Sequence, residues 1–227
     1  MILIMKKIIF ISILMTSAIC FAQSDPCIHF NAHTIDTDYP YVDLDLPSGT
    51  LWASMNVGAG CETDIGYYFM WADITGHDGT YYFSPDNYNS TPASNYNQSI
   101  QSGSTYDAAA QNWGSNWTMP TKAQMEELRD YCNYQWTSIN GVNGCKFSSK
   151  QDPSKYIFFP ECGYAVFGTV QYVTHAYCWF IDWVSVDHVY YSDLHYNSSI
   201  QKTVIGIYQE YLARWAGLPI RPIRVAP

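Results

Sequence analysis

The sequence predicts an α+β protein with two helices early in the chain and a β-rich C-terminal half. Two segments before residue 132 begin with helix-capping motifs, and hairpin dipeptides, an apolar run and spaced glycines follow them. Hydrophobic residues make up 48% of the 227 residues and charged residues only 14%, which is typical of a folded protein. A chain of this length favours one full domain, and we expect residues 41–227 to form it.

The first 22 residues have the pattern of a secretory signal peptide. Lys6 and Lys7 form a basic start, the run from Ile8 to Met15 is apolar, and small residues lead to a cleavage position after Ala22. An uncleaved anchor would need about 20 apolar residues, and a lipoprotein would need a better lipobox before Cys20. We therefore expect an exported protein of the periplasm, the outer surface or the medium, with no transmembrane segment after cleavage.

The domain is expected to begin with a β-hairpin. Residues 23–40 are polar and interrupted by prolines, which predicts an extended lead-in. Apolar and polar residues then alternate from Tyr41 to Leu46, Pro47-Ser48-Gly49 gives a turn signal, and Leu51-Trp52-Ala53 resumes the apolar pattern. Residues 76–103 are rich in Asn, Ser, Tyr and Gly without a period, so they are predicted to form a long surface loop.

Two helices are predicted from their N-terminal signals. Ser104 and Asp107 have the spacing of a capping box, and the three alanines that follow predict a short helix that ends by Gly114. Thr121 and Gln124 form a second capping box, and apolar residues after it share one helical face. This second helix is expected to run to about residue 131.

The rest of the chain is predicted to be strands and turns. Asn140-Gly141 and Asn143-Gly144 are hairpin dipeptides, and Lys155 to Pro160 is an apolar strand. Four glycines punctuate the strands that follow: Gly163, Gly168, Gly206 and Gly217.

The charge of the chain limits its partners. Eleven basic residues stand against 20 acidic ones, which gives a formal net charge of −9 at pH 7. Because no basic stripe is available to neutralise phosphates, nucleic acids and anionic membrane surfaces are poor partner candidates. Neutral or cationic ligands fit this charge better.

The cysteine count indicates disulfides but does not assign them. Loss of Cys20 with the signal leaves six cysteines, and six cysteines allow 15 pairings. An even number in an oxidising compartment favours disulfides, and buried free thiols are the alternative. No Cys-x-x-Cys occurs, so zinc-ribbon and thioredoxin-like sites are not supported. The six are Cys27, Cys61, Cys132, Cys145, Cys162 and Cys178.

Long motifs are spread over roughly residues 41–224. They include Val42-Asp43-Leu44-Asp45-Leu46-Pro47-Ser48-Gly49-Thr50-Leu51-Trp52-Ala53, Gly66-Tyr67-Tyr68-Phe69-Met70-Trp71-Ala72-Asp73, Trp117-Thr118-Met119-Pro120-Thr121 and Ile220-Arg221-Pro222-Ile223. Together these motifs resemble the Fibrobacter succinogenes major paralogous domain family, which occurs in secreted and surface proteins of Bacteroidota and related bacteria.

This resemblance implies a C-type-lectin-like fold. Distant relatives with that fold are the formylglycine-generating enzymes and the variable proteins that retroelements diversify. The chain departs from the family pattern at Trp179-Phe180-Ile181, where relatives usually have Trp-Ser-Ser, and the whole segment from 179 to 218 is atypical. Cysteines 61, 145, 162 and 178 also stand where the family often has other residues, so any disulfide there would be particular to this chain.

No sequence motif predicts catalysis or a cofactor. The chain has no Gly-x-Ser-x-Gly, and His175, His188 and His195 lack His-Glu-x-x-His spacing. The formylglycine-generating relatives work through a closely spaced cysteine pair near the end of the chain, but Lys202 to Ala216 contains no cysteine. We therefore expect no catalytic residues, no metal ligands and no cofactor.

A ligand-binding face is predicted in the C-terminal third, which is dense in Trp, Tyr, Asp and Arg. These residue types dominate binding hot spots, and the resemblance implies that ligands bind this region of the fold. Packing in the core is the alternative interpretation, above all for the two tryptophans 179 and 183. The candidate ligand-binding residues are Trp179, Asp182, Trp183, Tyr191, His195, Tyr211, Arg214 and Trp215.

The sequence therefore predicts a secreted or cell-surface ligand-binding module without catalytic activity, an adhesin-like protein with a glycan or protein ligand. An enzyme that keeps the formylglycine-generating scaffold with altered chemistry is one alternative. A receptor whose C-terminal face is diversified by a retroelement is another.

Overall fold

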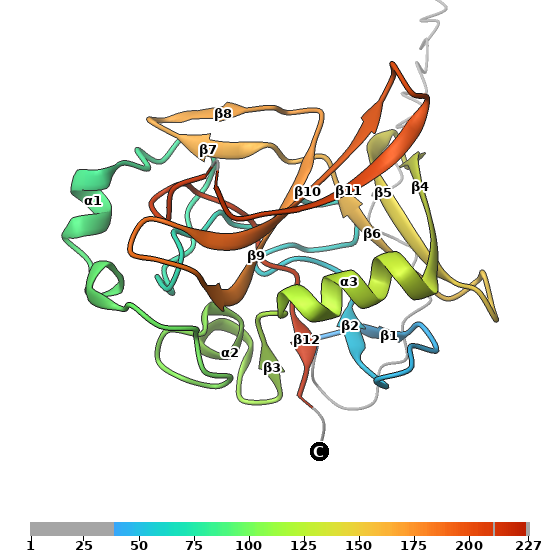
Figure 1. The fold of residues 1–227 in the computed structure, drawn as a ribbon, viewed down its shortest axis with the longest axis horizontal. Coiled ribbons are helices and arrows are strands. Elements are labelled where there is room, and N and C mark those ends of the chain that lie inside the picture. The colour runs from blue at the N-terminus through green and yellow to red at the C-terminus, as the bar shows by residue number, and fades with distance from the viewer. Residues whose placement is uncertain (1–38, 211, 226–227) are drawn as a thin grey trace, which may run out of the picture.

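The first and last strands of the fold lie in one sheet. The computed structural model describes residues 39–210 and 212–225. In it, β1 (Tyr41–Asp43) and β2 (Leu51–Ala53) form the predicted antiparallel hairpin. The last strand, β12 (Ile223–Arg224), lies between β2 and β3 (Trp117–Thr118), as Figure 1 shows. Segments some 170 residues apart in the sequence thus close the same sheet.

Several predictions fall outside the described residues. These are the signal peptide at residues 1–22, the lead-in up to residue 38, Cys27 and the candidate ligand-binding residue Tyr211. They stay predictions from the sequence.

Both predicted helices are present. Asp107 caps α2 (Ala108–Trp113) by accepting from the amides of Ala109 and Ala110. Thr121 and Gln124 form the predicted capping box of α3 (Lys122–Tyr131). Within the described part of the chain, no helix is long and apolar enough to cross a membrane.

The region predicted as a long loop contains two short helical segments. These are α1 (Pro85–Asn89) and the 3-10 helix η1 (Pro92–Asn95), which lie at the left of Figure 1. Each begins with a proline, and the Ser84 hydroxyl accepts from the amide of Asn87 to cap α1. Helices this short have no amphipathic period, which is why the sequence pattern did not reveal them.

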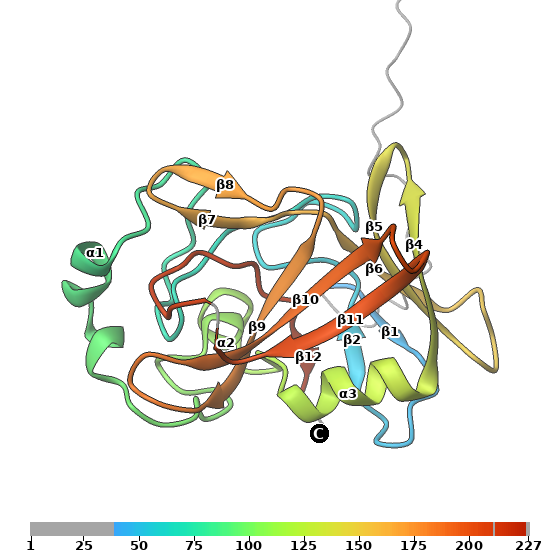
Figure 2. The same cartoon turned by 45° about the horizontal axis from the view of Figure 1, so that its top comes forward.

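The remaining strands form antiparallel sheets, so the α+β class is confirmed (Figures 1 and 2). The largest is β9 (Ala176–Trp183), β10 (Val189–Asn197) and β11 (Lys202–Tyr208), in the order β11-β10-β9. A second joins β4 (Cys132–Ile139), β5 (Val142–Ser149) and β6 (Tyr156–Pro160). A third is the hairpin of β7 (Tyr164–Val166) and β8 (Thr169–Gln171).

Only one of the two Asn-Gly pairs forms a turn. Asn140 and Gly141 both have positive φ, and they join β4 to β5. Gly144 instead lies inside β5, where a Cβ would stand 2.2 Å from the carbonyl oxygen of Phe159. The prediction of a second turn was wrong, because this glycine permits close approach of β6.

The β9-β10-β11 sheet separates two apolar cores. Trp179 and Tyr191 face the larger core, which reaches α2 and the loops before it. Phe180 and Leu194 point the opposite way into a second core, which contains Met125 of α3 and residues of β4 to β6. Figure 2 shows α3 below β10 and β11. Because both faces of this sheet are covered, the direction of each side chain is fixed by strand alternation.

Four cysteines are buried free thiols. Cys132, Cys145, Cys162 and Cys178 are unpaired, whereas Cys61 is disulfide-bonded. Burial raises the pKa of Cys132 to about 11 and those of Cys162 and Cys178 to about 12. For these four residues the structure bears out the alternative of buried free thiols, which pack as small apolar side chains.

Candidate functional site

A pocket of about 500 Å³ lies on one face of the β9-β10-β11 sheet. Its lining combines that sheet with the β7–β8 hairpin, which stands beside β10 in Figures 1 and 2. Five tyrosines and one carboxylate dominate it. The lining residues are Tyr164, Tyr172, Tyr177, Tyr191, Asp193, Tyr208 and Leu212.

Strand pairing places these side chains together. Asp193 of β10 is the cross-strand partner of Tyr177 in β9, and Tyr191 is the partner of Tyr208 in β11. Gly206 stands opposite Asp193 on the other side of β10. A Cβ at Gly206 would lie 2.2 Å from the Tyr208 ring, so the absence of a side chain lets that ring lie over the strand. Opposed residues of paired strands point to the same face, which gathers them at one site.

The tyrosine rings form a continuous aromatic surface. The rings of Tyr164 and Tyr172 stack with centroids 5.7 Å apart, and Tyr177 meets Tyr164 edge-on at 5.6 Å. Tyr191 lies 6.0 Å from Tyr208. Tyr172 is 61% exposed, whereas Tyr191 is only 2% exposed, so the surface runs from an open rim to a buried floor.

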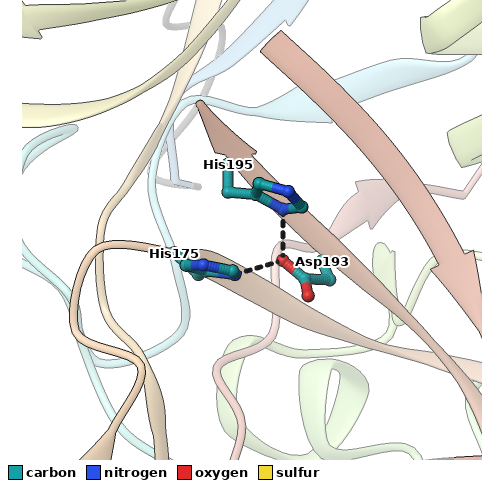
Figure 3. A group of neighbouring side chains, drawn as sticks. All are labelled: His175, Asp193 and His195. Atoms are coloured by element: carbon teal, nitrogen blue, oxygen red, sulfur yellow. Dashed lines mark hydrogen bonds and ion pairs between the residues drawn. The ribbon is translucent and has the colours of Figure 1, made fainter. Parts of the chain in front are cut away.

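Asp193 supplies the negative charge of the pocket. Its Oδ1 lies 2.7 Å from Nδ1 of His175 and 3.1 Å from Nδ1 of His195 (Figure 3). The Tyr177 hydroxyl donates to Oδ2 over 3.4 Å. Burial, reinforced by the charge of Asp193, holds the pKa of Tyr177 well above its usual range, so this hydroxyl stays a donor. The site therefore offers aromatic faces beside a carboxylate acceptor.

Two of the predicted ligand-binding residues meet at this pocket. Tyr191 lines it, and His195 contacts Asp193 at its edge. Trp215 is half-buried, with its ring 5.2 Å from that of Phe167, and Trp183 is half-buried against the larger core. Neither tryptophan belongs to the pocket lining.

Two other predicted residues are structural. Trp179 is completely buried, and its indole donates to the carbonyl of Phe69. Arg214 is 2% exposed and donates to the carbonyls of Ala93 and Tyr96, so it fixes the loop that carries η1. Both side chains are buried, so the structure favours packing in the core, the alternative interpretation, over contact with a ligand.

Asp182, another predicted binding residue, has a local structural role. Its carboxylate accepts from the amide of Lys122 at 2.6 Å, which satisfies one free donor at the N-terminus of α3. Burial nevertheless raises the pKa of Asp182 above its usual value. The side chain thus contributes a hydrogen bond, and its charge is poorly solvated.

The hydrogen bond of Asp182 and its poorly solvated charge together predict opposite effects of two substitutions. Alanine removes the acceptor and is expected to destabilise the protein by about 1 kcal/mol. Asparagine keeps an acceptor oxygen without the charge, so it is expected to match or exceed wild-type stability at pH 7. Because folding raises the pKa of this carboxyl, the wild-type protein loses stability as pH rises above the unfolded pKa, so the advantage of Asp182→Asn should grow from about pH 3.5 to about pH 7. Urea unfolding across this range measures it, and equal losses for both variants would contradict the assignment.

Most residues of the pocket were not predicted from the sequence, although some of them occur at every second position along the chain. Tyr191, Asp193 and His195 are spaced by two along one strand, and so are His175 and Tyr177. Such spacing puts side chains on one face of a sheet. The missing information was the pairing of β9 with β10, which brings the two alternating sets together.

Comparison with known proteins gives no match: no family model, no curated protein and no solved structure matches this chain.

Proposed function

We propose that this protein is a secreted or cell-surface binding module whose tyrosine-lined pocket holds a glycan. The observation that carries the proposal is the convergence of five tyrosines on a single carboxylate in one open pocket. A volume of about 500 Å³ is suited to a ligand of one or a few sugar units, since small-molecule sites span about 300–1,000 Å³.

The chemistry of the lining suits a sugar. The faces of pyranose rings carry C–H groups that pack on aromatic rings, and Tyr172 and Tyr208 offer such rings near the surface. Asp193 can accept from sugar hydroxyls, and tyrosine hydroxyls can both donate and accept. The acidic chain, with its net charge of −9, favours a neutral or amino sugar over an anionic one.

The C-type-lectin-like fold and the membership of the Fibrobacter succinogenes major paralogous domain family are part of this proposal. Support comes from the return of β12 to the N-terminal sheet and from the site on the C-terminal strands. A binding role is favoured over chemistry of the formylglycine-generating type, because the thiols of Cys162 and Cys178 are buried and their pKa values are raised. A protein ligand and a retroelement-diversified face remain the alternatives.

Truncation of the pocket rim is expected to weaken glycan binding. Tyr172 is exposed and packs on Tyr164, so Tyr172→Ala removes a stacking face without opening the core. We expect a loss of about 2 kcal/mol, roughly thirtyfold in affinity. The measurement is a glycan array on the mature protein, followed by calorimetry with the strongest saccharide.

Tyr131→Ala is the matched control, because Tyr131 is 53% exposed at the end of α3 and does not line the pocket. Far-UV circular dichroism should be unchanged for both variants. If no saccharide on the array binds, or if both variants bind equally well, the pocket is not a glycan site. Binding of a protein ligand that Tyr172→Ala abolishes would favour the alternative partner.

A further inference from the structure

Two histidines and an aspartate converge at the edge of the tyrosine pocket. His175, Asp193 and His195 each offer a ligand atom, and these atoms all lie within 4.8 Å of one another. The imidazole rings are nearly parallel, with centroids 4.3 Å apart and an interplanar angle of 20°. Figure 3 shows Oδ1 of Asp193 between the two rings. Three potential metal ligands therefore meet at one point.

The sheet fixes the positions of these three residues. Asp193 and His195 alternate along β10, and His175 immediately precedes β9. Leu194 pairs with Ala176 and Asp193 pairs with Tyr177, so the hydrogen-bonded ladder sets the spacing of the backbones. The amide of Cys162 also donates to the carbonyl of His175, which ties the start of β9 to a third segment. A ligand set held on paired strands is preorganised.

The donor set is that of a transition-metal site. Two imidazoles and one carboxylate are the protein ligands of many zinc centres that keep an open fourth position. In a tetrahedral zinc site the bonds are about 2.0–2.1 Å long, which places neighbouring ligand atoms about 3.3 Å apart. The Oδ1–Nδ1 distances are 2.7 and 3.1 Å, so the His195 pair is close to this value and the His175 pair would have to open by about half an ångström to admit the ion.

Charge and access also suit a cation. Within the described part of the chain, the recorded ion pairs of Asp193 are those with the two histidines, so no lysine or arginine neutralises it. Neutral imidazoles would leave the cluster with one negative charge. The three side chains are 16–20% exposed, which leaves room for an ion and its water to enter.

We propose that His175, Asp193 and His195 bind a divalent transition-metal ion of the zinc type. Each imidazole would present an unprotonated Nδ1 to the ion and carry its proton on Nε2, and any further proton that the ion displaces would pass to water. The expectation of no metal ligands rested on spacing along the chain, and the ligand set proposed here arises from strand pairing instead. This proposal is independent of the glycan proposal, because the metal alone is the probe.

The test is a Zn²⁺ titration of untagged mature protein that has been stripped of metal. Wild-type protein is expected to bind one Zn²⁺ more per chain than His175→Gln, Asp193→Asn or His195→Gln, or to bind it at least about tenfold more tightly. His188→Gln and Asp187→Asn are the matched controls, since both residues lie in the β9–β10 connection outside the cluster. Both controls should bind as wild type does. Absence of zinc binding by wild-type protein, or equal binding by all variants, would overturn the proposal.

A second measurement does not depend on the folding of any variant. Diethyl pyrocarbonate modifies accessible histidines, and mass spectrometry locates the modified residues. Zn²⁺ is expected to protect His175 and His195 in wild-type protein and to leave His188 reactive. Co²⁺ should give the intense visible absorption of a tetrahedral centre. If zinc does not change the extent of modification of His175 or His195, the cluster is a hydrogen-bonded group only.

Discussion

Replacing Arg221 by methionine is expected to destabilise the protein by about 3–5 kcal/mol, because it breaks a buried hydrogen-bond network. Arg221 is completely buried. Its guanidinium donates to Oδ1 of Asn56 at 2.8 Å and to the carbonyls of Ala53 and Phe158 at 3.1 and 2.6 Å. Methionine fills a similar volume but leaves these three buried acceptors without the guanidinium.

The charge of Arg221 survives this burial. Burial lowers the pKa of Arg221 to about 10, so the group stays protonated at pH 7. The guanidinium also lies over the ring of Phe159, 4.7 Å from its centroid. Arg221→Lys is expected to lose much of the same stability, because one ammonium cannot reach three acceptors arranged around a planar fork.

Arg129→Met provides the control for the loss of a cation. Its side chain is 36% exposed and pairs with the neighbouring Asp130, so we expect a change of less than about 1 kcal/mol. Chemical unfolding of the three variants measures the differences. A loss at Arg221→Met no larger than at Arg129→Met would show that the buried network contributes little.

Asp107→Ala is expected to cost about 3–5 kcal/mol, because it breaks a buried hydrogen-bond network and leaves several buried donors unpaired. The carboxylate is completely buried and accepts five hydrogen bonds. Two come from the first amides of α2, and the others come from the amides of Gly103 and Met119 and from the hydroxyl of Thr118. Alanine leaves all five donors without this acceptor, so the hydrogen bonds by which the carboxylate joins α2 to β3 are lost.

Asp107→Asn separates the charge from the shape of the side chain. Asparagine keeps one acceptor oxygen but brings an amide group that faces donors. We therefore expect this variant to be less stable than wild type and more stable than Asp107→Ala. Asp187→Ala, in an exposed loop position, should change stability by less than about 0.5 kcal/mol. Thermal and urea unfolding give the ranking, and an Asp107→Ala protein as stable as Asp187→Ala would refute the role of this carboxylate.

Local signals in the sequence predicted the elements whose stability is local. The capping box at Thr121 and Gln124 gave the start of α3 correctly, and the Asn140-Gly141 turn gave the β4–β5 hairpin. The same type of dipeptide failed at Gly144, because the need for glycine there comes from β6 and not from a turn. The sequence pattern does not distinguish a glycine that turns the chain from one that admits a neighbouring strand.

The candidate site depended on information that no short stretch contains. Trp179 is of a residue type that is common in binding hot spots, and it lies on the same face of β9 as Tyr177, but the larger core covers it completely, whereas Tyr177 and Asp193 line the pocket. Arg214 is also of a residue type that is common in hot spots, yet its guanidinium is bound by the carbonyls of Ala93 in η1 and of Tyr96 directly after it. The register of β9 against β10 decides which aromatic residues are available, and register is a tertiary property.

The position of β12 has a consequence for how the chain folds. A chain that emerges from its N-terminus presents β2 and β3 long before β12, and each strand then has an unpaired edge where β12 will bind. The sheet can be completed only when residues 223 and 224 arrive, so a contact of very high sequence separation comes last. Folding of the N-terminal sheet is thereby delayed until β12 has been synthesised, and any chain that stops short of β12 keeps two strand edges open to association with other molecules.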